Sequence, residues 1–131
     1  MMVLVDTSVW IDFFSSKPCP HVNTLENLIF NREDLCLCGI VLTEVLQGIR
    51  EDSEFKRTRD LLTNLILLPM AYSIFLRSAE IYRTLRKKGI TVKKPVDCMI
   101  AAVAIENDIP LLHNDKDFVP IKKHLGLKTL S

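Results

Sequence analysis

The sequence predicts an α/β fold in which a parallel sheet lies between helices on both of its faces. Short apolar segments alternate with longer segments of helical periodicity along the whole chain. Each short segment is apolar at consecutive positions, which is typical of parallel strands that are buried on both faces. Neither a repeat nor a linker interrupts this alternation. We therefore expect one domain over residues 1–131, with right-handed connections between its strands.

The expected elements begin with an apolar strand over residues 2–5, which stops at Asp6, where polar residues start a helix. Ser53 is suited to cap a charged helix, and Pro69 ends the strand that follows that helix. The remaining elements of this half, in order, are a helix over residues 23–30, a strand over 35–40, helices over 43–49 and 53–62, and a strand over 65–68.

The second half of the chain contains the longest expected helix. Apolar residues recur at helical spacing over residues 73–88, and Gly89 is a typical residue after a helix end. Pro95 suits the first turn of the next helix. The elements that complete the fold are a helix over residues 95–107, a strand over 109–112 and a possible fifth strand over 128–130.

Composition places the chain among folded, water-soluble proteins. Hydrophobic residues make up 48% of the chain and charged residues 25%. The formal net charge of +1 neither indicates nor excludes a nucleic-acid partner. The opening MMVLVDTS has no basic region and too few apolar residues for a signal peptide or a membrane span. We expect a cytoplasmic protein with no membrane partner.

The four cysteines predict neither a disulfide framework nor a zinc site. None forms a Cys-x-x-Cys pair, and only three histidines are present. Cys36 and Cys38 lie in an apolar run. Buried thiols in a reducing compartment are therefore the simpler interpretation.

Five acidic residues are expected at one edge of the sheet. Asp6 ends the first strand, and Glu44 follows the second strand by a few residues. Asp115 and Asp117 follow the fourth strand, and Asp97 lies in the first turn of the helix that leads into that strand. Sites in open parallel sheets gather at the carboxyl ends of the strands, so these acids from distant parts of the sequence are expected to meet.

Each acid also has a structural interpretation. Asp6 suits a helix N-cap, and Asp97 is favoured in a first turn by the helix dipole. Asp115 and Asp117 suit a turn. Glu44 has apolar neighbours on both sides, and an ionised carboxylate that is buried among them needs a partner. The structural interpretations together require several independent coincidences at one edge, which favours a functional site.

Crowded carboxylates predict a hard divalent cation. Carboxylates raise one another's pKa values unless a cation neutralises them. Oxygen ligands without thiolate or imidazole suit Mg²⁺, for which Mn²⁺ is expected to substitute. Such an ion lowers the pKa of a bound water and stabilises a leaving oxygen, so phosphodiester hydrolysis fits this donor set best.

Basic residues precede Asp97 and supply positive charge for a polyanion beside the acids. The alternative is a solvated helix face. Within this stretch the candidates for contact with such a polyanion are Arg86, Lys87, Lys93 and Lys94, accompanied by Arg77, Arg83 and Lys88.

Four segments together resemble the motifs of PIN-domain ribonucleases, and in particular of VapC-type toxins. They are VLVDTSVWIDF, VLTEVLQGI, PVDCMIAAVAIENDIPLL and HNDKDF, in this order. The resemblance covers residues 3–121. Each motif alone is weak, and their order gives the resemblance its specificity.

The resemblance implies roles for the acids. Asp6, Glu44 and Asp97 fall on the three most regular acids of the family, and Asp115 falls on a fourth, more variable one, with Asp117 nearby. Asp6, Asp97 and one of Asp115 or Asp117 are expected to bind the metal ion. Glu44 is expected to complete the shell or to help deprotonate the attacking water.

Three further residues are expected to support the acids. The hydroxyl of Thr7 or Ser8 is expected to donate hydrogen bonds within the metal and water shell. His113 departs from the family pattern, in which Thr is more frequent. It is larger than Thr and titrates near neutral pH, so the setting of the fourth acid stays open.

The resemblance also implies a fold, a substrate and partners. The family fold is a five-stranded parallel sheet between helices, and its members cut RNA, usually dimerise and are silenced by a cognate antitoxin. The antitoxin's C-terminal segment reaches along a groove into the active site. The candidates for lining this groove are Val9, Trp10, Phe13 and Phe14, with the helices near Leu46 and Leu61; ordinary core packing is the alternative.

Other function classes fit some of the same residues. A phosphoacceptor signalling module needs an acceptor Asp after a central strand, yet the third expected strand ends in Pro69 without an acid. A non-catalytic RNA-binding or partner-binding domain would keep the fold without the metal. A DNA nuclease also remains open, because the acids alone do not distinguish ribose from deoxyribose.

Overall fold

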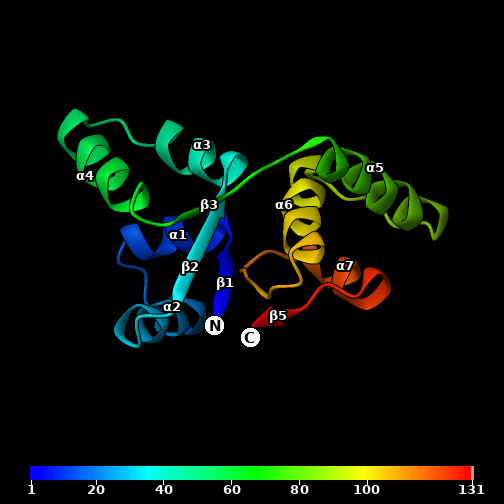
Figure 1. Cartoon of the computed structure of the whole chain (residues 1–131), viewed down its shortest axis with the longest axis horizontal. Coiled ribbons are helices and arrows are strands. Elements are labelled where there is room, and N and C mark those ends of the chain that lie inside the picture. Colours follow the sequence, from blue (N-terminus) through cyan, green and yellow to red (C-terminus); the bar gives the residue numbers. More distant parts are fainter. Residues whose placement is uncertain (131) are drawn as a thin grey trace.

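The computed structural model describes residues 1–130 and contains one five-stranded parallel sheet, in the order β3-β2-β1-β4-β5 (Figure 1). This architecture confirms the predicted α/β class and the parallel sheet, including the fifth strand. The strands are β1 (Met2–Val5), β2 (Asp34–Cys38), β3 (Ile66–Leu68), β4 (Leu111–Leu112) and β5 (Thr129–Leu130).

The strand order reverses direction at the pair formed by β1 and β4. From β1 the chain continues outward to β2 and β3, and it then crosses back to β4 on the other side of β1. The backbone N–H of Asp6 donates to the carbonyl of Leu112 at 2.9 Å, which fixes the ends of these two strands side by side. Ligands of open parallel sheets bind at such a switch point, because the connecting segments diverge there.

Seven helices connect the strands of the described chain. Figure 1 shows α1 to α4 around the first three strands and α5 to α7 together on the other side of the molecule. Helix α6 packs against both α5 and α7, and α1 packs against α2 and α3. The helices are α1 (Thr7–Phe14), α2 (Pro20–Phe30), α3 (Gly39–Gln47), α4 (Asp52–Leu62), α5 (Tyr72–Lys87), α6 (Pro95–Glu106) and α7 (Phe118–Leu125).

Most elements differ from their predicted bounds by a few residues: α2 begins at Pro20 instead of residue 23, and α3 covers Gly39–Gln47 instead of residues 43–49. Strand β2 ends at Cys38 and α3 begins at Gly39, although the apolar run predicted strand up to residue 40. The run stays apolar across this boundary, and no side chain caps the helix, so the sequence carries no start signal. Helix α7 was not expected; it ends at Gly126, whose φ of 75° is in the left-handed region that suits glycine.

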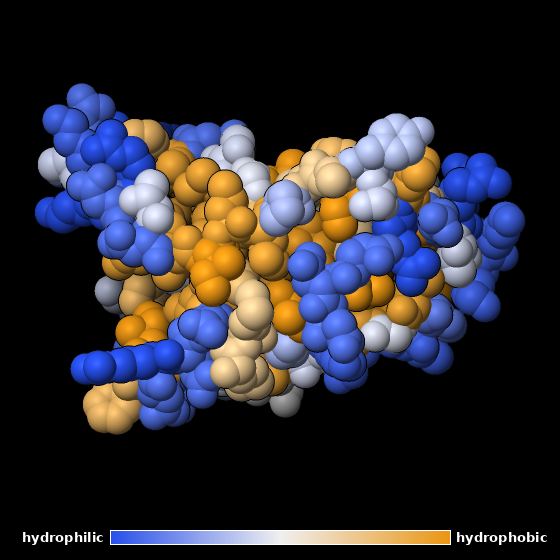
Figure 2. Space-filling view, in the orientation of Figure 1, coloured by the Kyte–Doolittle hydropathy of each residue, from blue (hydrophilic) through white to orange (hydrophobic). Residues whose placement is uncertain are grey.

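The core lies on both faces of the sheet, as the continuously apolar strands predict. Val3, Leu4 and Val5 are fully buried, and α6 is buried on most of its surface, including small side chains such as Ala101 and Ala104. Figure 2 shows hydrophilic side chains at both ends of the long axis, with apolar side chains exposed between them. Within residues 1–130, no helix combines the length and apolar character that a membrane crossing requires.

Candidate active site

Asp6 lies at the carboxyl end of β1 and caps α1. Its Oδ2 accepts hydrogen bonds from the Ser8 backbone N–H at 3.1 Å and from the Ser8 hydroxyl at 2.6 Å. Asp6 is only 3% exposed, and its Oδ1 is buried without a hydrogen-bond partner among the described residues. The capping interpretation is therefore correct for one oxygen, while the other stays available for a ligand.

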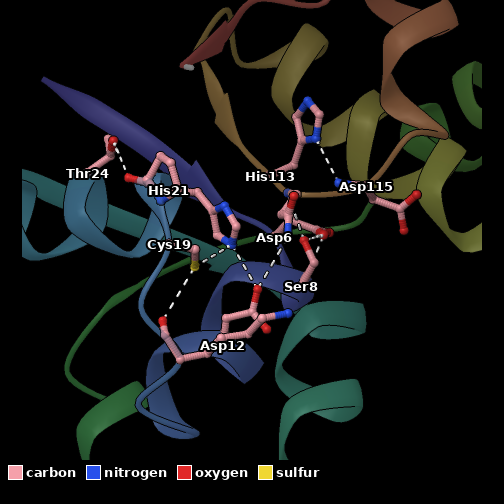
Figure 3. A network of polar contacts seen from close by, with 11 residues as sticks. Asp6, Ser8, Asp12, Cys19, His21, Thr24, His113 and Asp115 are labelled. Atoms are coloured by element: carbon pink, nitrogen blue, oxygen red, sulfur yellow. Dashed lines mark hydrogen bonds and ion pairs between the residues drawn. The ribbon is translucent and has the colours of Figure 1, made fainter.

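The segment that follows β4 lies beside Ser8, next to Asp6 at the start of α1. The Ser8 hydroxyl accepts a hydrogen bond from the backbone N–H of Asn114 at 3.0 Å, which ties this segment to the start of α1. The backbone N–H of Asp117 donates to Asp115 Oδ1 at 2.9 Å, so the two carboxylates share one turn. Figure 3 shows Asp115 and His113 on one side of Asp6 and Ser8.

Asp97 enters this cluster from the first turn of α6. It is 3% exposed, and its Oδ2 is buried without a hydrogen-bond partner in the described chain. One oxygen from each of Asp97, Asp115 and Asp117 lies within 4.8 Å of the others, which is close enough to share a metal ion. The structure thus brings together three of the predicted carboxylates, and Asp6 is close enough that its charge acts on Asp97.

The ammonium group of Lys94 supplies the positive charge that neutralises these acids in the structure. Its Nζ forms a charged hydrogen bond with Asp115 Oδ2 and lies 3.7 Å from Asp97 Oδ2. Its backbone N–H donates to Asp117 Oδ2 at 3.2 Å. The ammonium group stands where a carboxylate cluster needs positive charge.

Burial and mutual repulsion act on the pKa values of the buried acids. Burial, together with the charges of Asp6 and Asp115, raises the pKa of Asp97 to about 7, although Lys94 opposes this shift. Burial also raises the pKa of Asp6, against the hydrogen bonds from Ser8. Both acids therefore hold a proton more readily than an ordinary aspartate, which indicates a shortage of positive charge at the site.

The pKa values of Asp115 and Lys94 are each shifted so that the ionised form is favoured. Burial acts to raise the pKa of Asp115, but the hydrogen bonds from Lys94 and from the Asp117 backbone outweigh it and hold the pKa below its ordinary value. The same hydrogen bond to Asp115 raises the pKa of Lys94. This pair is therefore ionised at neutral pH.

Glu44 lies at the side of the cluster rather than within it. Its Oε1 accepts a hydrogen bond from the Thr7 hydroxyl at 2.8 Å, which links α3 to the residue that follows Asp6. Glu44 is half-buried and lines a cavity with Ile11 and Phe14, so it is more accessible than its apolar neighbours in the sequence suggest.

His113 positions the turn that carries Asp115. Its Nδ1 accepts a hydrogen bond from the Asp115 backbone N–H at 3.1 Å, and its ring centroid lies 4.8 Å from that of Phe118. Burial lowers the pKa of His113, against the charge of Asp115, which favours the neutral ring that can accept this bond. In this structure the ring nitrogen Nδ1 accepts, whereas a threonine hydroxyl would also be able to donate.

The basic residues divide into two groups. Lys93 and Lys94 are exposed and line a cavity with Asn114, Asp115 and Asp117. Arg86 and Lys87 lie in the last turn of α5, where the Arg86 guanidinium is 5.8 Å from the centroid of the Tyr82 ring.

The residues predicted to line a groove differ in burial: some lie in the core and others line a cavity. Val9 and Trp10 are fully buried, so the core interpretation is correct for both. Trp10 stacks on Phe14 with centroids 5.8 Å apart. Phe14 and Ile11 line the cavity beside Glu44, and this cavity lies between α1, α3 and the start of α4.

Sequence reasoning missed two residues of the polar network. Asn114 donates from its backbone to Ser8 and from its side chain to Asp12 Oδ2 at 3.3 Å. Asp12 in turn contacts His21 Nε2 at 2.8 Å. Asp12 lies six residues after Asp6, a spacing that places the two side chains on different helix faces, so no sequence signal connects these two acids.

The donor set fits a hard divalent cation. Asp6 Oδ1 and Asp97 Oδ2 are buried carboxylate oxygens that lack hydrogen-bond partners within residues 1–130, and a buried charged oxygen without a partner is costly. Their neighbours Asp115 and Asp117 add further carboxylate oxygens. Oxygen ligands of this kind suit Mg²⁺ or Mn²⁺.

Sequence comparison connects this geometry to a known family. Residues 3–123 match the family model described as PIN domain. The chain is 30% identical to Ribonuclease VapC11 of Mycobacterium tuberculosis, with 99% of this chain and 98% of that protein covered. It is also 30% identical to Ribonuclease VapC1 of Methanocaldococcus jannaschii, with 96% and 85% covered.

Structure comparison gives a consistent result. The fold is similar to a crystal structure of VapBC2 from Rickettsia felis bound to a DNA fragment from their promoter, with a TM-score of 0.78 and 22% identity over 99% of this chain and 98% of that one. It is also similar to VapBC-1 from nontypeable Haemophilus influenzae, with a TM-score of 0.75 and 24% identity over 100% and 98%. The likeness therefore extends over the whole sheet and all of the helices around it.

Proposed function

Because this chain belongs to the PIN domain family, and within it to the VapC group, we propose that it is a Mg²⁺- or Mn²⁺-dependent endoribonuclease that acts as the toxin of a toxin–antitoxin pair. Its relatives of similar length are named ribonucleases. In this proposal the chain is a single nuclease domain that hydrolyses RNA phosphodiester bonds in the cytoplasm.

The observation that carries this proposal is the pair of unpartnered carboxylate oxygens on Asp6 and Asp97. Both acids are 3% exposed, and both come from elements that meet at the switch point of the sheet. A structural cap or a first-turn acid is normally satisfied by the backbone or by water. Neither oxygen has a hydrogen-bond partner within residues 1–130, and only Asp97 Oδ2 has a cation near it, Lys94 Nζ at 3.7 Å; a divalent cation bound beside Asp115 explains this arrangement better.

We assign the metal to Asp6, Asp97 and Asp115, with Asp117 as a further ligand. When bound, Mg²⁺ or Mn²⁺ supplies a Lewis acid that lowers the pKa of an attacking water and neutralises charge at the phosphate. In this proposal Glu44, which accepts a hydrogen bond from Thr7 at 2.8 Å beside the cluster, would accept the proton of that water. Ser8 holds Asp6 in position through two hydrogen bonds.

The lysines beside the carboxylates are suited to hold the RNA backbone. Lys93 and Lys94 line the cavity that contains Asp115, and both are exposed. Phosphate oxygens are recognised by lysine without regard to base sequence, so these residues contribute to affinity rather than to the choice of target. Arg86 and Lys87, at the end of α5, extend the basic surface in the same proposal.

The antitoxin is proposed to bind in the cavity beside Glu44. This cavity is lined by apolar side chains from α1 and by Glu44, Arg50 and Glu54, so it presents both an apolar floor and charges. Structures of similar fold are complexes of toxin and antitoxin. A protomer that pairs with a second copy of itself, as the family resemblance implies, completes the proposed assembly.

The experiment that tests this function is RNA cleavage by the purified chain with Mg²⁺, with Mn²⁺ and with a chelator. Asp6→Asn and Asp97→Asn keep the size of each side chain and remove its negative charge. We expect both variants to fold and to lose most of the cleavage. Calorimetry with Mn²⁺ distinguishes the ribonuclease from a non-catalytic domain, which would bind no metal. Uptake of phosphate from acetyl phosphate would instead identify a phosphoacceptor module.

A further inference from the structure

A second group of metal-binding side chains lies outside the carboxylate cluster. Asp12 of α1 and His21 at the start of α2 are in contact, with 2.8 Å between Asp12 Oδ2 and His21 Nε2. Cys19 Sγ lies 3.0 Å from the same His21 nitrogen. One donor atom of each residue lies within 4.8 Å of the others (Figure 3).

The backbone around these residues holds them in place. Cys19 lies between Pro18 and Pro20, and its backbone is extended, with φ −162° and ψ 158°. A residue that precedes proline favours this extended region, and each proline ring fixes its own φ, so the backbone that carries the Cys19 side chain is restricted before any ligand arrives. The Lys17 backbone N–H donates to the Asp12 carbonyl at 3.0 Å, which closes the loop between the two helices.

We propose that Asp12, Cys19 and His21 form a binding site for Zn²⁺. Thiolate sulfur, imidazole nitrogen and carboxylate oxygen are the three kinds of protein ligand that zinc takes, and a water completes four-coordination where the protein supplies three. Tetrahedral zinc would separate these donor atoms by roughly 3.3–3.6 Å, as its bond lengths require. The contacts at 2.8 and 3.0 Å reach that spacing by small side-chain rotations.

Ligand type distinguishes this site from the carboxylate cluster, and solvent can reach it. The side chains of Asp12 and His21 are 15% and 13% exposed, so an ion can reach them from solvent. Cys19 is half-buried, whereas Cys36, Cys38 and Cys98 are buried, so within residues 1–130 it is the accessible thiol. Sulfur and nitrogen donors favour Zn²⁺ over Mg²⁺, while oxygen donors alone favour Mg²⁺.

The sequence did not predict this site, because ligand spacing was the only guide. Cys19 and His21 are two residues apart, a spacing that matches none of the zinc motifs, and the third ligand comes from a different helix. The expectation that the chain has no zinc site therefore rested on a spacing rule that does not cover ligands brought together by the packing of α1 against α2.

Hydrogen bonds connect the zinc site to the proposed catalytic acid. The Asn114 side chain donates to Asp12 Oδ2, and the Asn114 backbone donates to the Ser8 hydroxyl, which donates to Asp6. Zinc that takes Asp12 as a ligand competes with Asn114 for the same carboxylate. Occupation of the site consequently alters the support of the turn that carries Asp115.

The test measures zinc binding directly and does not depend on nuclease activity. The native chain, Cys19→Ser and His21→Gln are dialysed against Zn²⁺ in excess Mg²⁺, and the retained zinc is measured by mass spectrometry. We expect about one zinc per native chain and at least a tenfold weaker affinity in each variant. Co²⁺ should give a thiolate-to-metal absorption band in the native chain that Cys19→Ser lacks.

Two controls identify the site. His124→Gln removes a half-buried histidine elsewhere and should retain zinc at the native level. Asp97→Asn should also retain it, because this acid belongs to the other cluster. The proposal is overturned if the native chain retains no zinc, if Cys19→Ser and His21→Gln retain the native amount, or if Asp97→Asn alone abolishes binding.

Discussion

The Ser8 hydroxyl accepts a hydrogen bond at 3.0 Å from the backbone N–H of Asn114, a residue 106 positions later in the chain. The same hydroxyl donates to Asp6 Oδ2 at 2.6 Å. One side chain therefore joins the end of β1 to the segment after β4 and holds two parts of the candidate site in register.

Replacing this hydroxyl should affect both stability and activity. Ser8→Ala leaves the Asn114 N–H without its acceptor and removes one of the two bonds to Asp6, so we expect a loss of about 1–2 kcal/mol in unfolding free energy. RNA cleavage should fall more than tenfold through misplacement of Asp6. Ser73→Ala, at an exposed position in α5, should change stability by less than about 0.5 kcal/mol. Equal stabilities of the two variants would contradict this role of Ser8.

The pH dependence of stability should reveal the burial of Asp97. Burial raises its pKa from 3.8 to about 7 in the folded chain, so between these values the folded protein binds a proton that the unfolded chain has released. Without metal, the contribution of Asp97 to stability is therefore present at low pH and lost as pH rises from about 4 to 7.

Asp97→Asn isolates this contribution, because the amide does not titrate. Both proteins are unfolded with urea in the presence of chelator. As pH rises across that window, the unfolding free energy of the variant relative to that of the native chain should increase by up to about 1.4 kcal/mol per pH unit. Added Mg²⁺ should reduce the difference by favouring the ionised carboxylate. The raised pKa of Asp97 would be contradicted if the two stability profiles ran parallel with pH. It would also be contradicted if the variant became less stable relative to the native chain as pH rises.

Lys94 should compete with the metal ion for the carboxylates. Its ammonium group is hydrogen-bonded to Asp115 and lies 3.7 Å from Asp97. In Lys94→Gln the carboxylates lose this neutralising charge, so Mn²⁺ should bind about tenfold more tightly in calorimetry without RNA, which corresponds to about 1.4 kcal/mol. Lys88→Gln removes an equal charge beyond the end of α5 and should leave the affinity unchanged. Weaker Mn²⁺ binding in Lys94→Gln would show that the lysine supports the metal site instead.

Trp10 should behave as a core residue and not as a partner-binding residue. It is fully buried and packs on Phe13 and Phe14. Trp10→Ala should lower the free energy of unfolding by about 3–5 kcal/mol, because it leaves a large cavity. Phe30→Ala, at a side chain that is 86% exposed, should lower it by less than about 0.5 kcal/mol. Chemical denaturation measures both, and a Trp10→Ala protein of native stability would contradict this placement.

That the acids lie near one another could be predicted from the sequence, because strand ends can be recognised without a structure. Asp6 and Asp115 each follow an apolar run, and a parallel sheet brings the carboxyl ends of its strands to one edge. The order of the strands was supplied only by the structure. Hydrophobic runs do not specify which strand lies beside which, so the pairing of β1 with β4 could not be derived from them.

Contacts between elements could not be predicted from the sequence. The pairing of Lys94 with Asp115 and the group formed by Asp12 and His21 depend on how the connecting segments pack. The burial of Trp10 was also undecided, since an apolar residue on a helix face suits a core and a groove equally. Helix α7 was missed because its first turn follows a run of turn-forming residues without a side-chain cap.

Cleavage of a mixed pool of structured cellular RNAs decides whether the carboxylate cluster is a metal-dependent nuclease site. The native chain is compared with Asp97→Asn in Mg²⁺, in Mn²⁺ and in chelator, and Mn²⁺ binding is measured on the same preparations. We expect discrete cuts that require the metal and that disappear in Asp97→Asn although this variant is folded. Native-rate cleavage in chelator or by Asp97→Asn, or a native chain that neither cuts RNA nor binds Mn²⁺, would contradict it.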